Sequence, residues 1–301
     1  QIISAAALAD IDISHTLGSS IEICSGNSLS SPFTSQSATG GSNAQTYKWQ
    51  YNVNQSGWVD DVSTTTPQTS YTYSQPITQN VKVRRITTDQ NASYKSNEIT
   101  ITVKSVPTIN ISAQVAGSGG VVLNSSNNNK YPDGINADLV ASGPSAGSFA
   151  SYLWSTGATT QSINVTTGAT TSYSVTGTTS DNCSSTASLT IDISNLDPGI
   201  INNQSLCNGD SPSTLSVSND GGGTNNGTFK WYQSTDGGAN YTEISGATSP
   251  TYNPGSITST TLYKRQITDY NVVKETNPAS IVVAVSPQVS VTPIATTITI
   301  G

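Results

Sequence analysis

The residues that could carry chemistry in this chain are few and lie far apart. The single histidine, His15, lies in a polar segment, "SHTLGSS", that we expect to be a solvated linker. One imidazole without a neighbouring nucleophile and carboxylate builds neither a triad nor a typical metal site. The three cysteines, Cys24, Cys183 and Cys207, lack the close pairs of zinc sites, and their odd number leaves at least one unpaired. We predict no catalytic residue and no enzyme activity.

Scattered aspartates raise the question of calcium, because hard cations bind clustered oxygen ligands. Asp192 and Asp197 flank a predicted domain junction, where an ion would stiffen the chain. No spacing matches a calcium loop, so we predict no metal site and no cofactor, with calcium at a junction as the alternative. The aspartates considered are Asp10, Asp12, Asp60, Asp61, Asp192, Asp197 and Asp236.

Tryptophans on predicted strands are the best candidates for a structural core. A β-sandwich of about 90 residues buries one large aromatic side chain between its sheets. We therefore expect Trp49, Trp154 and Trp231 in the core, with sugar stacking as the alternative. Trp58 follows a glycine in a turn and is the better candidate for surface contact, although packing on its own hairpin is expected.

The composition predicts strands and excludes several kinds of partner. Charged residues make up 10% of the chain, against about 25% in ordinary domains, while 13 tyrosines and many Val, Ile and Thr residues suit pleated sheets. A net charge of −7 argues against nucleic acid and anionic membranes. No apolar run approaches the roughly 20 residues of a spanning helix. Because the chain starts at Gln1 and has no Met, we expect it to be cut from a longer protein.

Two kinds of internal repeat alternate along the chain. "TYKWQYNVNQSGWVDD" matches "TFKWYQSTDGGANYTE", and the same offset within a few residues aligns Cys24 with Cys207 and Arg84 with Arg265. The middle segment, with "YLWSTGATTQSINVTTG", is of another kind. We call the first kind A-type and the second B-type. The predicted boundaries are 1–16 (last strand of a preceding B-type domain), 17–105 (A-type), 106–195 (B-type), 196–286 (A-type) and 287–301 (first strand of a following B-type domain).

Apolar and polar residues alternate with a period of two in runs such as "NEITITVKS", "TSYSVTG" and "SLTIDIS", and Gly, Asn and Pro turns separate such runs. This pattern predicts an all-β fold of tandem immunoglobulin-like Greek-key sandwiches in an extended array. Short Pro-containing links should stiffen this array. Arg84, Arg85 and Arg265 lie on strands whose side chains alternate between the inside and the outside of the sandwich. We expect all three at exposed ladder positions.

The A-type domains resemble the immunoglobulin-like repeats of giant surface proteins from Bacteroidetes. The resemblance rests on "ICSGNS", "YKWQY", "SGWVDD", "QTSYTY", "VRRIT" and "SNEITITV", and for the B-type domain on Trp154 to Ile163. It implies a gliding-motility or adhesion protein exported by type IX secretion to the cell surface. In many such repeats the early cysteine pairs with a second cysteine shortly after the Arg-containing strand. That second cysteine is missing here. We therefore expect three free, mostly buried thiols, with a Cys183–Cys207 disulfide as the alternative.

The leading hypothesis is a non-catalytic stalk segment of a large secreted cell-surface adhesin. Its partners would be neighbouring repeats of the same chain and, through weak multivalent contacts, polysaccharide or abiotic surfaces. A second hypothesis is a self-assembling extracellular filament or sheath, joined edge to edge through the strand-forming segments 4–14 and 289–300. A third is an accessory region of a secreted polysaccharide-degrading enzyme.

Overall fold

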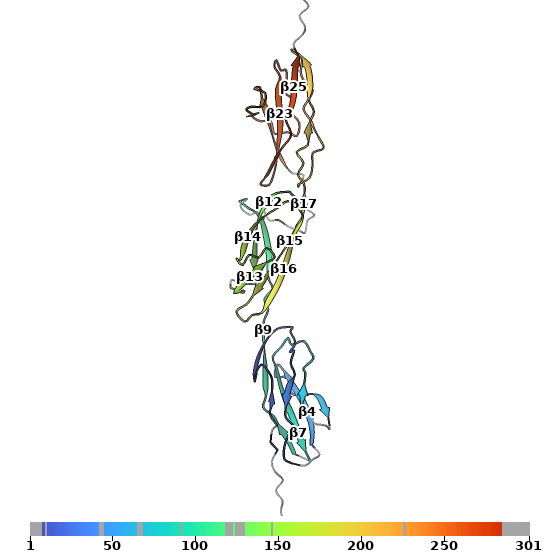
Figure 1. Ribbon diagram of the computed structural model, residues 1–301, viewed down its shortest axis with the longest axis vertical. Helices are drawn as coiled ribbons and strands as arrows, with labels where there is room; N and C mark the ends of the chain where they lie inside the picture. Colours follow the sequence, from blue (N-terminus) through green and yellow to red (C-terminus); the bar gives the residue numbers. More distant parts are fainter. Residues whose placement is uncertain are drawn as a thin grey trace, which may run out of the picture. The chain divides into compact units, whose positions relative to one another are not determined.

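The computed structural model describes residues 8–9, 11–41, 45–64, 69–90, 92–117, 123, 130–145, 147–224 and 227–284. Within them every regular element is a β-strand, so the expected all-β fold of tandem sandwiches is confirmed (Figure 1). The chain divides into two compact units. The first holds 1–109 with 143–152 and 176–186, and the second holds 110–142, 153–175 and 187–301.

The first sandwich consists of a three-stranded and a six-stranded sheet, ordered β1-β3-β6 and β2-β9-β7-β4-β5 with β8 beside β7. Its core includes Phe33, Trp49 and Ile101. The inward residues alternate along β7, as the period-two pattern requires. The strands are β1 (Ile13–Ser14), β2 (Ser20–Cys24), β3 (Phe33–Ser35), β4 (Gln45–Val53), β5 (Val59–Thr64), β6 (Ser70–Tyr71), β7 (Val81–Asp89), β8 (Ala92–Lys95) and β9 (Ile99–Lys104).

The middle segment forms the sheets β10-β12-β14, β13-β15-β16 and β11-β17. Strands β13, β15 and β16 each run from one compact unit into the other. The strands are β10 (Asn110–Val115), β11 (Tyr131–Pro132), β12 (Ile135–Ser142), β13 (Ser151–Trp154), β14 (Ser162–Thr167), β15 (Thr171–Thr178), β16 (Ser184–Ile191) and β17 (Ile193–Ser194).

The third sandwich repeats the plan of the first, with β18-β20 in one sheet and β19-β25-β23-β21-β22 in the other, and β24 beside β23. Its core includes Trp231, Tyr263 and Ile281. The strands are β18 (Ile200–Ile201), β19 (Gln204–Cys207), β20 (Val217–Ser218), β21 (Thr228–Ser234), β22 (Thr242–Glu243), β23 (Thr261–Asp269), β24 (Val272–Glu275) and β25 (Ala279–Ala284).

The first boundary needs a correction, because β1 belongs to the first sandwich and not to a preceding domain. Ile13 and Ser14 pair with β3, and Ile13 is buried in the core beside Phe33. The side-chain amide of Asn97 covers the other side of Ile13, accepting from its N–H at 2.7 Å and donating to its carbonyl at 2.9 Å. Alternating short strands look alike in sequence, which is why this segment resembled the end of the B-type domain.

Candidate functional site

The first A-type domain and the B-type domain are joined by a disulfide between Cys24 and Cys183. Cys24 is the last residue of β2, opposite Lys104 of β9, at the end of the sandwich where the chain leaves it. Cys183 lies in the turn between β15 and β16. The two Cα atoms are 5.5 Å apart, within the usual range for a disulfide, although the residues are 159 positions apart in sequence. This covalent junction, which lies within the first compact unit, is the most distinctive feature of the chain.

The expectation of three free thiols is therefore wrong, and so is the alternative Cys183–Cys207 pair. Cys207 is the free cysteine, and it is exposed. The partner of Cys24 lies in the next domain, so the pattern of a single domain does not reveal it. Cys183 itself is 1% exposed, as expected for a half-cystine enclosed between two domains.

Polar contacts lie beside the disulfide. The Lys104 ammonium lies 3.0 Å from Glu22 and 3.6 Å from Asp181, and these carboxylates raise the pKa of Lys104, Glu22 through the larger effect. The Ser185 hydroxyl donates to the carbonyl of Pro107 at 2.7 Å. Exposed ion pairs contribute little by themselves. The disulfide is the strongest link at this junction.

Gly177 allows the aromatic packing beside this junction. A Cβ at Gly177 would lie 2.7 Å from both Ile109 and Phe149, too close for any other residue. Phe149 also makes an edge contact with Tyr152, with ring centroids 6.0 Å apart. This apolar packing within the B-type domain therefore depends on a glycine within β15.

The B-type domain meets the second A-type domain through non-covalent contacts, all within the second compact unit. The Asn271 side chain makes reciprocal hydrogen bonds with the backbone of Asn136, at 3.3 and 3.0 Å. The ring of Tyr270 lies 5.7 Å from that of Tyr131. Tyr270 has a φ of 52°, so a left-handed turn at the end of β23 presents both residues to the junction.

Asp133 and Lys274 form an ion pair at the second junction, at 2.6 Å. Asp133 also accepts a hydrogen bond from the backbone N–H of Leu196 at 2.7 Å. Burial raises the pKa of Asp133, but the lysine and the backbone donor outweigh it, so the net pKa lies below the ordinary value. At this junction, the ammonium group of Lys274 and the backbone N–H of Leu196 thus satisfy the carboxylate of Asp133.

The aspartates predicted at this junction have other roles. Asp197 accepts from the N–H of Gly199 at 2.8 Å, and the backbone of Asp192 accepts from Tyr131. Asp10 lies outside the described residues. Among the described residues, no group of three or more His, Cys, Asp or Glu side chains converges as metal ligands would.

Arg85 and Arg265 are fully buried, which corrects the expectation of exposed ladder positions for both. Each lies opposite the core tryptophan of its domain, Trp49 or Trp231, so Arg85 and not Arg84 is the counterpart of Arg265. Only Arg84 is partly exposed, and its guanidinium lies 3.7 Å from the ring centre of Trp58.

The buried arginines hold the segment by which the chain enters each A-type domain. Arg85 donates to the carbonyls of Gln36 at 2.9 Å and Ile11 at 3.3 Å. Arg265 donates to the carbonyl of Pro198 at 3.0 Å and to Asp220 at 2.8 Å. Such acceptors compensate the cost of burying a guanidinium. Each arginine therefore fastens an entry segment to the core of its domain.

His15 is also placed differently from the prediction, because it is buried and not solvated. Its Nδ1 accepts from the N–H of Leu17 at 3.1 Å, which makes Nε2 the donor to the carbonyl of Ser31 at 3.0 Å. The ring packs on Phe33, with centroids 5.1 Å apart. His15 is a structural residue of the β1–β2 connection.

The core tryptophans are Trp49, Trp154 and Trp231, with exposed fractions of 0, 2 and 0%. The indole N–H of Trp154 donates to Thr160 and that of Trp231 to Ser249, both backbone carbonyls. Rings enclosed in this way cannot stack on a sugar. They hold the two sheets of each sandwich together.

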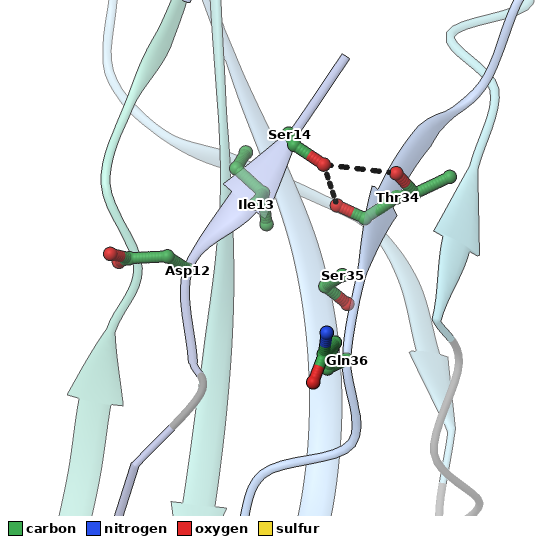
Figure 2. A pocket seen from close by; sticks show the side chains of 6 residues that line it. All are labelled: Asp12, Ile13, Ser14, Thr34, Ser35 and Gln36. Carbon is green, nitrogen blue, oxygen red and sulfur yellow. Dashed lines mark hydrogen bonds between the residues drawn. The ribbon is translucent and has the colours of Figure 1, made fainter. Parts of the chain in front are cut away.

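A shallow polar groove of about 390 Å³ lies beside β1 and β3 of the first sandwich (Figure 2). The hydroxyl groups of Ser14 and Thr34, on these paired strands, are hydrogen-bonded at 3.1 Å (dashed in Figure 2). Asp12 accepts from the N–H of Asn97, and the Ser35 hydroxyl accepts from Arg85. These polar groups stabilise the strand pair, and they form no constellation of nucleophile, base and oxyanion donor. The groove is lined by Asp12, Ile13, Ser14, Thr34, Ser35 and Gln36.

Residues 198–287 match a family model described as "Domain of unknown function (DUF8696)", and this range covers the second A-type domain. No curated protein matches. Among solved structures, a 1.5-MDa bacterial ice-binding adhesin is 14% identical over 93% of this chain and 99% of that chain, with a TM-score of 0.30. Domains A168–A170 of titin are 9% identical over 91% and 97%, also with a TM-score of 0.30. Scores this low carry no argument, so the fold rests on the strand pairing above.

The part of the chain that the structure describes contains no helix with the length and apolarity needed to cross a bilayer.

Proposed function

We propose that this chain is a non-catalytic repeat segment of a large secreted cell-surface adhesin, in which tandem sandwiches carry tension and present binding regions located elsewhere. The observation that carries this proposal is the Cys24–Cys183 disulfide between two successive domains. A disulfide within one domain would stabilise that domain alone. One between domains changes how force passes along the chain.

Tension applied to the two ends of the chain would cross from Cys24 directly to Cys183. Residues 25–182, which include most of the first sandwich and most of the B-type domain, lie inside the covalent loop and bear no extension. Only the strands outside the loop, such as β2 and β16, can be pulled away from their neighbours. The disulfide thus limits how far two domains can lengthen, as expected for a stalk.

Two further features fit a chain under tension. Arg85 and Arg265 fasten the entry segments of the two A-type domains, where pulling would begin. The strand that follows each entry, β2 or β19, pairs in parallel with the last strand of its sandwich, β9 or β25. The β19–β25 pair lies outside the covalent loop, so tension on the ends of the chain loads it along its length, and several hydrogen bonds must break together.

The resemblance to repeats of giant Bacteroidetes surface proteins supports export by type IX secretion and an extracellular location, and these belong to the proposal. The filament hypothesis loses part of its motivation, because Ile13 and Ser14 already pair with β3 and Asn97 covers Ile13. Its second segment, 289–300, lies outside the described residues.

The proposal is tested by stretching single chains between handles at the two ends, in a Cys207→Ser background that leaves no free thiol. The fully unfolded chain should be shorter without reductant than with it. The disulfide encloses a separation of 159 residues, which at ~3.3–3.6 Å per residue corresponds to about 550 Å of hidden length.

The matched control is the Cys24→Ser, Cys183→Ser double variant, which should reach the full length with or without reductant. Equal lengths for the parent chain in both conditions would show that force does not bypass the loop, and would contradict the proposal.

A further inference from the structure

The second A-type domain repeats the site of Cys24 at Cys207. Cys207 is the last residue of β19 and lies opposite Ala284 of the parallel strand β25. In the first A-type domain, Cys24 is the last residue of β2 and lies opposite Lys104 of the parallel strand β9. The turns that follow are also the same. The carbonyl of each cysteine accepts a hydrogen bond at 3.1 Å from the N–H three residues later, and Gly26 and Gly209 have φ values of 88° and 93°. The two cysteines therefore occupy equivalent positions.

The two sites differ in occupancy. Cys24 is bonded to Cys183 of the following domain, whereas Cys207 is an exposed free thiol. The sequences that follow the two domains are similar, since a proline comes three residues after both Lys104 and Ala284, as Pro107 and Pro287. A domain of the B-type after Pro287 would thus bring its own β15–β16 turn to Cys207.

We propose that Cys207 is half of a second inter-domain disulfide, and that the other half is a cysteine at the position of Cys183 in a B-type domain that continues from Pro287. This inference rests on the tandem array of the proposed function. The ion pairs of the first junction are not repeated, because Ser205 and Ala284 stand where Glu22 and Lys104 stand there. The disulfide is the feature that both junctions would share.

The bond would form by thiol–disulfide exchange with a small-molecule disulfide such as oxidised glutathione. The Cys207 thiolate attacks the oxidant, forms a mixed disulfide and releases one glutathione thiolate. The partner thiolate then attacks the Cys207 sulfur and releases the second. Two protein thiols lose two protons and two electrons, and the oxidant is reduced to two thiols.

The test uses a chain in which a second copy of residues 107–195 replaces 287–301, so that the copied Pro107 takes the place of Pro287. After refolding in a glutathione redox buffer, Ellman's reagent should find no free thiol in this chain, against one in the chain of 301 residues. A non-reduced digest should contain Cys207 linked to the copied Cys183. With Cys183→Ser in the copy alone, one thiol should remain.

A free Cys207 beside a protease-resistant copy, in molecules that have formed Cys24–Cys183, would overturn the inference. If the copied domain does not become protease-resistant, the test is repeated with a second chain in which residues 104–106 also replace 284–286. The thiol count and the linked peptide then decide as before. Neither result affects the proposed function, because the hidden length of the original chain depends on Cys24–Cys183 alone.

Discussion

Each A-type domain buries an indole ring and a guanidinium group in its interior. Trp49 lies opposite Arg85 across the β4–β7 pair, and Trp231 lies opposite Arg265 across the β21–β23 pair. Each tryptophan provides a large apolar surface, and each arginine reaches carbonyls on the entry segment of its domain. The stability of each A-type domain and the fastening of its entry segment thus depend on a tryptophan and an arginine that are neighbours in the same sheet.

Replacing Trp49 with alanine should lower the free energy of unfolding of the first sandwich by about 3–5 kcal/mol, because it leaves a cavity in the core. Trp58→Ala is the matched control in the same domain. It removes a ring that stacks on Arg84 near the surface, and should cost about 0.5–1 kcal/mol. Urea unfolding followed by circular dichroism measures both. Equal losses would contradict the assignment of Trp49 to the core.

Part of the residue-scale description could be predicted from the sequence. The tryptophans lie on recognisable strands, and their size favours the interior. Arg84 and Arg85 are adjacent, so one points inward and the other outward, and the alternation alone does not say which. The acceptors that permit burial of Arg85 lie about 50 and 74 residues away, at Gln36 and Ile11. Pairing at such distances follows from the folded topology and not from a local pattern.

At the scale of elements, the β23–β24 turn forms the contact between the second A-type domain and the B-type domain. It contributes Tyr270 and Asn271, and Lys274 of β24 binds Asp133 beside β11. Strands were predictable from their period of two, but the contacts made by a turn depend on which domain faces it. The short strand β1 was assigned to the wrong domain for a similar reason, since its pattern fits any edge strand.

The Asp133–Lys274 pair should give the second junction a specific pH dependence. The pKa of Asp133 is lowered in the folded chain, so its stabilising effect is complete above the ordinary carboxyl pKa of about 4 and disappears as the pH falls through the lowered value. Asp133→Asn keeps an acceptor for Leu196 and should cost about 0.5–1 kcal/mol from pH 5 to 8. Below pH 4 the variant and the parent chain should converge in melting temperature.

Calorimetry between pH 2.5 and 8 measures this difference. Asp60→Asn is the control, because Asp60 pairs with Lys48 on an exposed hairpin of the first sandwich and should not change the melting of the second A-type domain. A cost for Asp133→Asn that persists unchanged to pH 3 would contradict the role of the ion pair.

At the scale of the whole molecule, alternating domains are joined in two different ways. The A-type to B-type junction is covalent, and the B-type to A-type junction consists of hydrogen bonds, a ring contact and an ion pair. The alternation itself was predictable from the internal repeats. The disulfide was not, because its two cysteines belong to different domains and meet only where those domains abut.

The most direct test of this account is to map the cysteines of the non-reduced chain by protease digestion and mass spectrometry, together with a thiol titration. The account predicts a peptide linking Cys24 to Cys183, and one thiol, Cys207, that reacts without denaturant. Three reactive thiols, or a link from Cys207 to either of the other two, would contradict it and remove the covalent junction on which the proposed function rests.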